Sequence, residues 1–149
     1  MAADARIFSL TLPSELRMLS VARTFVEAVG QACALERRII HAVVTATGEA
    51  VANIIRHAHR NLPAAAVHLQ FQVLTEAAVL VFRDQGEPFD IALVPRLDPG
   101  ELRIGGRGVF LMRALMDEVV CEPRLPGQRG NTLRLVKRYV GAEQVRTCG

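Results

Sequence analysis

Two short segments with the residue patterns of strands, joined by a tight turn, constrain the fold of this chain more than any other feature. Residues 67–73 alternate apolar and polar side chains, which is the pattern of a strand with one buried face and one wet face. Residues 78–82 are apolar throughout, and only a short turn at Glu76 and Ala77 separates the two runs. Strands joined by so short a turn pair in antiparallel orientation. The pattern therefore predicts an antiparallel pair of strands.

The other elements follow from the same kind of periodicity. Ser14 is a good N-cap for the first helix, and Gly48 lies inside the second, where a close neighbour or a close ligand would explain the missing side chain. The expected strands are at 8–12, 118–122 and 132–139, and the expected helices are at 14–30, 35–57 and 106–116.

The order of the elements defines the fold class. Strand, helix, helix, two strands, a long loop over 84–106, helix and two strands predict a mixed, mainly antiparallel sheet. About three helices cover its apolar face, which makes an α/β (α+β) two-layer sandwich. The chain 1–149 is expected to be one domain, with a core at about 7–138 and a loose tail at 139–149. A loop of this length is typical of a lid or a binding loop.

Composition argues against several classes of function. The net charge is +3 and the pI is near 9.1, but 17 of the 18 basic residues are arginines scattered along the chain. With no tryptophan and one tyrosine, a base-stacking surface for nucleic acid is poorly supported. Three cysteines without a C-x-x-C pair indicate neither a disulfide framework nor a zinc site. No apolar stretch is long enough to cross a membrane and the first residues lack the pattern of a secretory signal, so a cytoplasmic protein is expected.

A polar stripe on the second helix carries the first candidate site. Glu49, Asn53 and His57 are spaced i, i+4 and i+8 beside the apolar stripe. An amide oxygen is a hard, neutral ligand for Mg²⁺, and a carboxylate one turn away can take a proton from an attacking hydroxyl group. Taken alone, the same stripe is much more typical of a solvated helix face.

The turn after the apolar strand is the second candidate. Asp84 stands at the end of a rigid strand, where its side chain can project into a pocket. Its carboxylate can accept a hydrogen bond from an exocyclic amine. Gly86, two residues later, would let the backbone approach a flat ring. The competing interpretation is an ordinary Asp-x-Gly turn.

The start of the third helix is the third candidate. Gly105, Gly106 and Gly108 surround Arg107, and Val109 begins the apolar run. Exposed backbone N–H groups at the positive end of a helix favour phosphate, and Arg107 can add charge-assisted hydrogen bonds. The spacing matches neither the P-loop nor the dinucleotide fingerprint. A glycine-rich hinge without a ligand remains the alternative.

The order of these motifs is more specific than any one of them. A helical E-x-x-x-N, a strand-terminal D-x-G, a long loop, a G-x-G helix start and a final G-x-T at Gly130–Thr132 resemble the GHKL ATPase domain, the Bergerat fold, over about Ile7–Arg138. Within that superfamily the segments EAVANIIRHA, DQGEPFD and GGRGVFLMRALMDEV are similar to the RsbW-type anti-sigma-factor serine/threonine kinases.

The resemblance implies ATP and Mg²⁺ as cofactors and gives each motif a role. Glu49 would be the general base and Asn53 the Mg²⁺ ligand. Asp84 would bind the adenine amine, with Gly86 under the ring and Thr132 supporting the same end of the pocket.

The same resemblance implies that the third helix start binds the phosphates. Gly106 and Gly108 would present backbone amides, and residues from about 91 to 105 would close over the nucleotide. Two positions depart from the pattern of relatives: Ile104 stands where sporulation kinases have Arg, and Pro88 where many have Gly.

The resemblance also implies partners. The acceptor would be a serine on a small anti-anti-sigma (antagonist) protein, and the kinase would hold a sigma factor or an equivalent regulator inactive. A homodimer is expected, through the sheet edge or the N-terminal region, without direct contact with nucleic acid or membrane. The alternative is a non-catalytic ATP-binding module whose lid conformation controls partner binding.

Overall fold

The computed structural model describes residues 5–58, 65–86, 107–122, 127 and 129–139. The strands are β1 Arg6–Pro13, β2 Ala66–Val73, β3 Ala77–Asp84, β4 Glu118–Cys121 and β5 Asn131–Arg138. The helices are α1 Leu19–Ala32, α2 Arg37–Asn53 and α3 Arg107–Leu115, with a 3-10 turn, η1 Leu16–Met18, before α1 and a π-helical turn, η2 Ile54–Ala58, after α2. In this part of the chain no helix is long and apolar enough to cross a membrane.

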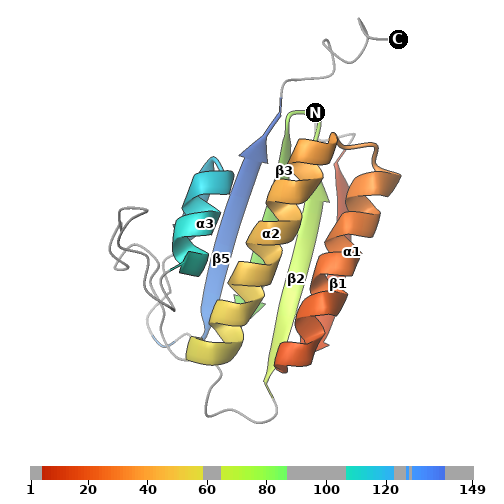
Figure 1. Cartoon of the computed structure of the whole chain (residues 1–149). Coiled ribbons are helices and arrows are strands. Elements are labelled where there is room, and N and C mark those ends of the chain that lie inside the picture. Colours follow the sequence, from red (N-terminus) through yellow and green to blue (C-terminus); the bar gives the residue numbers. More distant parts are fainter. Residues whose placement is uncertain (1–4, 59–64, 87–106, 123–126, 128, 140–149) are drawn as a thin grey trace, which may run out of the picture.

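The strands form one sheet in the order β1-β2-β3-β5-β4, and the helices lie on one face of it (Figure 1). The predicted two-layer α+β sandwich is therefore confirmed. All pairings between the described strands are antiparallel. The sheet of the described strands is therefore antiparallel rather than mixed, because a mixed sheet would need a parallel pair. Strands β3 and β4 do run in the same direction, but β5 lies between them and keeps them from pairing.

The uniformly apolar strand of the sequence is β3, which lies at the centre of the sheet. Leu80 and Phe82 face the helices and belong to the main core. Val79 and Val81 face the other side, where they form a small buried cluster with Val136 of β5. Because buried clusters cover β3 on both faces, residues 78–82 are apolar throughout and show no polar alternation.

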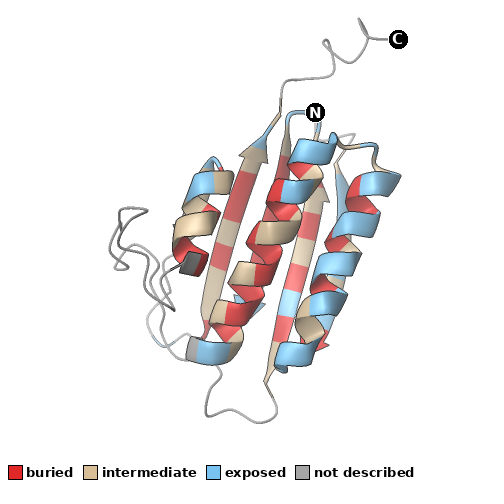
Figure 2. Ribbon diagram, in the orientation of Figure 1, coloured by how far each residue is buried: buried red, intermediate tan, exposed pale blue. Residues whose placement is uncertain are grey.

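Helices α1 and α2 lie side by side over the sheet and bury their inner faces against it (Figure 2). Val26 of α1, Phe71 of β2 and Phe82 of β3 are fully buried in this core. Gly48 lies where α2 faces α1: a Cβ on Gly48 would be 2.4 Å from Nε of Arg23. The close neighbour expected at Gly48 is thus a side chain of α1.

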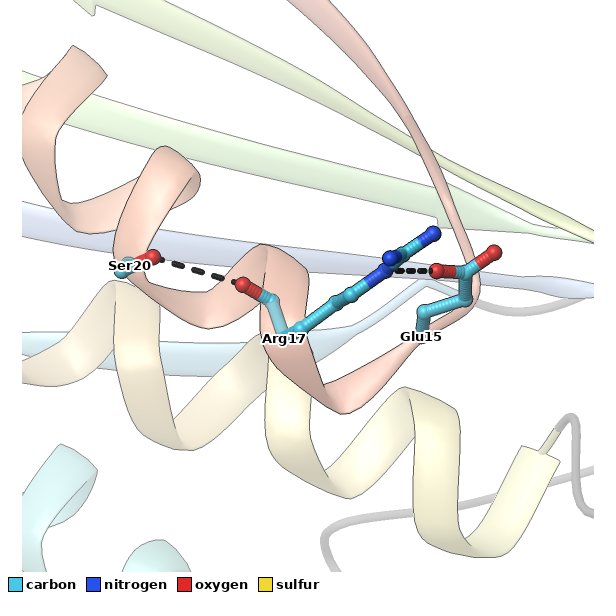
Figure 3. Close-up of polar contacts among 3 residues, drawn as sticks. All are labelled: Glu15, Arg17 and Ser20. Atoms are coloured by element: carbon cyan, nitrogen blue, oxygen red, sulfur yellow. Dashed lines mark hydrogen bonds and ion pairs between the residues drawn. The ribbon is translucent and has the colours of Figure 1, made fainter.

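The chain between β1 and α1 differs from the expected helix start. The turn η1 has Glu15 as its N-cap residue, with no side-chain cap hydrogen bond, and the α-helix begins only at Leu19. Nε of Arg17 donates to Oε2 of Glu15, and the hydroxyl of Ser20 donates to the carbonyl oxygen of Arg17 at 3.3 Å (Figure 3). The prediction of Ser14 as the N-cap is wrong because the 3-10 turn takes the place of the first α-helical turn.

Tyr139 ties the end of β5 to the turn between β2 and β3. Its backbone N–H donates to the carbonyl oxygen of Glu76 at 3.1 Å, and its hydroxyl contacts the carbonyl oxygens of Leu74 and, at 3.0 Å, Ala77. Burial raises the pKa of this hydroxyl above its ordinary value, so the neutral donor is favoured. Tyr139 is therefore part of the folded domain rather than of the expected loose tail. Residues 140–149 lie outside the described residues.

Gly130 allows β5 to begin directly against the end of β3. Its φ is +94°, a backbone conformation that side-chain-bearing residues rarely adopt. A Cβ on Gly130 would lie 2.0 Å from the carbonyl oxygen of Asp84, which belongs to the backbone of β3. The register then pairs Asp84 with Asn131. Gly130 thus sets the spacing between two strand ends.

Replacing Gly130 by Ala is expected to destabilise the fold strongly. The left-handed backbone alone costs a non-glycine residue about 1–2 kcal/mol, and overlap with the Asp84 carbonyl adds to that. Gly127→Ala is the matched control, because Gly127 has φ +85° and nothing within 4 Å of a Cβ. Urea unfolding curves of both variants measure the difference. Equal losses of stability would contradict the close approach at Gly130.

Candidate functional site

The carboxylate of Asp84 is held from two sides at the end of β3. Its Oδ1 accepts a hydrogen bond from the backbone N–H of Gly86 at 2.8 Å and another from the side-chain amide of Asn131 at 2.9 Å. The first bond closes the predicted Asp-x-Gly turn. Asp84 is only 6% exposed. A buried carboxylate fixed in this way is an oriented hydrogen-bond acceptor at the strand end.

A pocket lies beside Asp84, between the end of α2, the middle of α3 and the strands β4 and β5. Its cavity volume is about 20 Å³, the room of about one water molecule, within about 340 Å³ of non-atom space that includes open solvent. Its polar lining residues are Asn53, Asp84 and Asn131, and its other lining residues are Ala50, Ile54, Met112, Cys121 and Leu133. A mostly apolar pocket with a few polar groups suits a flat ring with polar edges.

The N-terminal turn of α3 lies against the end of α2 because Gly108 has no side chain. A Cβ on Gly108 would be 2.6 Å from Oε2 of Glu49 and 3.5 Å from the side-chain nitrogen of Asn53. Two motifs about 55 residues apart in the sequence therefore meet in space. The half-buried carboxylate of Glu49 lies near the positive end of the α3 dipole, where negative charge is stabilised.

Asn53 connects the two halves of the site. It lines the pocket together with Asp84, and it also lies beside Gly108. Its side-chain nitrogen is buried and has no hydrogen-bond partner among the described residues. Leaving a buried polar group unpaired costs about 1–3 kcal/mol. An amide in this state is suited to a ligand that supplies the missing partner.

The first turn of α3 provides backbone donors rather than side chains. The helix starts at Arg107, and the N–H groups of its first residues have no partner inside the helix. The side chain of Val109 is buried in the main core, so only its backbone amide is suited to a ligand. Gly105, Gly106 and the expected lid at 91–105 lie outside the described residues, as does the side chain of Arg107.

Thr132, predicted to support the same end of the pocket, is not among the residues that line the pocket. Side chains alternate along β5, so Asn131 and Leu133 face the pocket while Thr132 faces the other side of the sheet. Asn131 takes the place expected of Thr132 and orients Asp84 through its amide. The G-x-T pattern contained this residue as its unspecified middle position.

Met112 and Cys121 are among the pocket residues that were not predicted from the sequence. Met112 is fully buried and lies four residues after Gly108, so helical periodicity contained a signal for it. Cys121 enters the pocket from β4 because it pairs with Leu133 of β5. That register depends on strand pairing, which no local pattern reveals.

His57 does not extend the stripe of Glu49 and Asn53 along a regular helix. From Ile54 to Ala58 the backbone is π-helical, with a wider turn than the 3.6 residues that i+4 spacing assumes. The side chain of His57 lies outside the described residues. The change begins directly after Asn53, and π-helical turns are frequent at functional sites.

The side chains described here fit a magnesium ion only if a ligand brings further oxygens. In the described ranges no group of three His, Cys, Asp or Glu side chains could hold a metal ion. Mg²⁺ typically uses one or two protein ligands together with water and phosphate oxygens. The amide of Asn53, next to Glu49, is compatible with that donor set.

Comparison with known proteins places this geometry in a family. Residues 12–137 match the histidine kinase-like ATPase domain. The serine-protein kinase RsbW of Staphylococcus epidermidis is 32% identical, over 94% of this chain and 91% of that protein. The serine-protein kinase RsbW of Oceanobacillus iheyensis is 25% identical, over 91% of this chain and 88% of that protein.

A solved structure shares the fold. The crystal structure of the RsbU and RsbW domains of a Mycobacterium tuberculosis protein matches with a TM-score of 0.65 and 16% identity, over 89% of this chain and 32% of that chain. Fold and sequence therefore agree. The chain belongs to the histidine kinase-like ATPase family, among the RsbW serine-protein kinases.

Proposed function

We propose that this chain is an ATP-dependent serine kinase and anti-sigma factor that works in the cytoplasm. The observation that carries the proposal is the meeting of Glu49, Asn53 and Gly108 beside the pocket of Asp84. Nucleotide binding alone does not need a carboxylate beside the start of α3. Phosphate transfer to a hydroxyl group does call for a general base, and a carboxylate in this place can take the hydroxyl proton. Relatives named serine-protein kinase RsbW support the same activity.

The adenine ring would occupy the pocket beside β3. Asp84 would accept a hydrogen bond from the exocyclic amine, because Gly86 and Asn131 already hold its carboxylate in place. Gly86 is itself buried and has no side chain to keep the ring away. Met112 and Leu133 would supply apolar contact to the ring.

The phosphates would lie at the start of α3. Backbone amides of its first turn, including those of Gly108 and Val109, would bind phosphate oxygens, and Asn53 would hold Mg²⁺. Magnesium, when bound, would neutralise charge on the phosphates. Glu49 would take the proton of the attacking serine hydroxyl. Because phosphoryl transfer needs mainly positioning and charge neutralisation, these few groups suffice.

The proposed acceptor is a serine of a small antagonist protein, and the regulator that the kinase holds is a sigma factor. Support comes from the relatives, which match over nearly their whole length. The working assembly is proposed to be a homodimer. ATP would thus serve a switch between two protein partners rather than metabolism.

Replacing Glu49 by Ala is expected to abolish phosphate transfer while ATP still binds. Loss of a general base lowers the rate about 10²–10⁴-fold. The measurement is transfer of labelled γ-phosphate from Mg·ATP to a candidate small antagonist protein from the same genome. Glu27→Ala, an exposed position on α1, is the control and should keep the wild-type rate. A wild-type protein that binds ATP but phosphorylates no antagonist would overturn the kinase proposal.

Replacing Asp84 by Asn is expected to remove the preference for adenine. The new amide keeps an oxygen for Gly86 and Asn131 but presents an NH₂ group in place of the second carboxylate oxygen. Losing a charge-assisted hydrogen bond of about 1.5–3 kcal/mol raises the Kd for ATP roughly 10- to 100-fold. Calorimetry with ATP and with inosine triphosphate, which lacks the amine, measures the effect.

Asp117→Asn is the control for this variant, because Asp117 is exposed and lies outside the pocket. The wild-type protein and the control should bind ATP more tightly than inosine triphosphate, whereas Asp84→Asn should bind inosine triphosphate at least as tightly as ATP, because its NH₂ group can donate to the ring carbonyl that replaces the amine. Retained discrimination in Asp84→Asn would show that another group reads the amine.

Replacing Gly108 by Ala is expected to slow phosphate transfer without unfolding the protein. The added Cβ would overlap Oε2 of Glu49 and displace the carboxylate, but Ala favours a helix over Gly by about 1 kcal/mol. The transfer rate should fall while the melting temperature holds or rises. The double variant with Glu49→Ala should be no slower than Glu49→Ala alone. Additive losses would mean that Gly108 acts independently of Glu49.

A further inference from the structure

A second concave region lies at the opposite end of the elements that build the nucleotide site. The first turns of α2, the last turn of α3 and the end of β5 line a shallow, largely open groove of about 670 Å³. The nucleotide site uses the other ends of the same three elements (Figure 1). Along α3, Gly108 beside Glu49 and Ala114 at the groove are six residues, or about 9 Å, apart.

The groove has basic side chains around apolar ones. Its lining residues are Arg37, Arg38, His41 and Lys137, together with Ala42, Ala114 and Leu115. Among the described residues no carboxylate lines it. Arg38 pairs with the exposed Glu36 at 3.0 Å, whereas no ion-pair partner for Arg37 or Lys137 occurs in the described part of the chain. The positive charge of the groove is therefore not neutralised from within.

Arg37 and Arg38 oppose the electrostatics of their own helix. They are the first two residues of α2, whose first turn has no acidic residue and whose N-cap, Glu36, makes no side-chain cap hydrogen bond. The N-terminus of a helix carries partial positive charge, so cations are unfavourable there. Residues that destabilise their own helix are expected at positions that serve a function.

Lys137 is likewise a positive charge at an unfavourable position, because the face of β5 on which it lies is otherwise mainly apolar. It is the one lysine of the chain, and alternation places it on the helix-covered face with Leu133 and Leu135 of the core. Its half-buried stem can pack on apolar neighbours while the amine stays hydrated. A helix start and a strand end thus bring charge to one groove independently.

We propose that this basic groove docks an acidic, amphipathic segment of a protein partner. Carboxylates of the segment pair with Arg37 and Lys137, and an apolar residue between them packs on Ala42 and Leu115. A protein segment fits better than nucleic acid, because no aromatic side chain lines the groove to stack on a base and because apolar groups lie between the cations. Docking needs no phosphate transfer, so it stands apart from the kinase activity.

Binding of a fluorescent peptide with Glu and Leu at helical spacing tests the proposal by anisotropy. The wild-type chain should bind it, and the Arg37→Glu/Lys137→Glu variant should bind at least about tenfold more weakly. The Arg6→Glu/Arg134→Glu variant undergoes the same change of charge outside the groove, and it should stay within about twofold of wild type. A peptide with Gln in place of Glu should not bind.

Lys137 offers a second readout, which reports where the peptide binds rather than whether charge contributes to binding. Because no other lysine is present, an amine-acetylating reagent modifies one side chain, and mass spectrometry follows its rate. The Glu/Leu peptide should slow acetylation of Lys137. If thermal melting shows that the charge-reversed groove variant is unfolded, Arg37→Gln/Lys137→Gln replaces it, with the same expected loss of binding.

Several results would overturn the proposal. These are absence of peptide binding, equal weakening in both charge-reversed variants, unchanged acetylation of Lys137, or tighter groove-dependent binding of a single-stranded oligonucleotide than of the peptide. The Glu49→Ala chain should bind the peptide as wild type does. A failed kinase assay and a failed docking assay are therefore distinguishable.

Discussion

The approach of Gly130 to the carbonyl oxygen of Asp84 is the contact on which the site depends. It brings the start of β5 against the end of β3 and so places the amide of Asn131 at 2.9 Å from the Asp84 carboxylate. A carboxylate that is 6% exposed is costly unless its oxygens are hydrogen-bonded. The same bonds that offset this cost also fix the direction of the side chain, so the acceptor is in place before any ligand arrives.

The start of α3, where we propose that the phosphates lie, shows a similar close approach. Gly108 lets α3 approach Glu49, as Gly130 lets β5 approach Asp84. In each case a missing side chain brings backbone next to an acidic residue, and Asn53 lies between the two places. The site is thus defined by close approaches of main chain, which leave little freedom for its two acidic groups. Long flexible side chains would hold the same groups less firmly.

Local periodicity was sufficient to predict the elements and much of the site. The spacing of Glu49 and Asn53 and the glycine at 108 predicted groups that the fold brings together. Features that depend on pairing between distant segments were not predictable in this way. Asn131 in place of Thr132, Cys121 in the pocket and β5 between β3 and β4 all follow from strand register. The basic groove was also not predictable from the sequence, because Arg37 and Lys137 are distant in the sequence and meet only in the fold.

The distance along the chain between β3 and β5 bears on the order in which the protein folds. Strands β2 and β3 are joined by a turn, but Asp84 and Asn131 are 47 residues apart. Closing so long a loop costs more entropy than closing the turn between β2 and β3 does. The pocket takes residues from both strands and is absent until they meet. A nascent chain therefore cannot engage nucleotide before β5 has left the ribosome, and bound nucleotide stabilises only molecules that have completed that step.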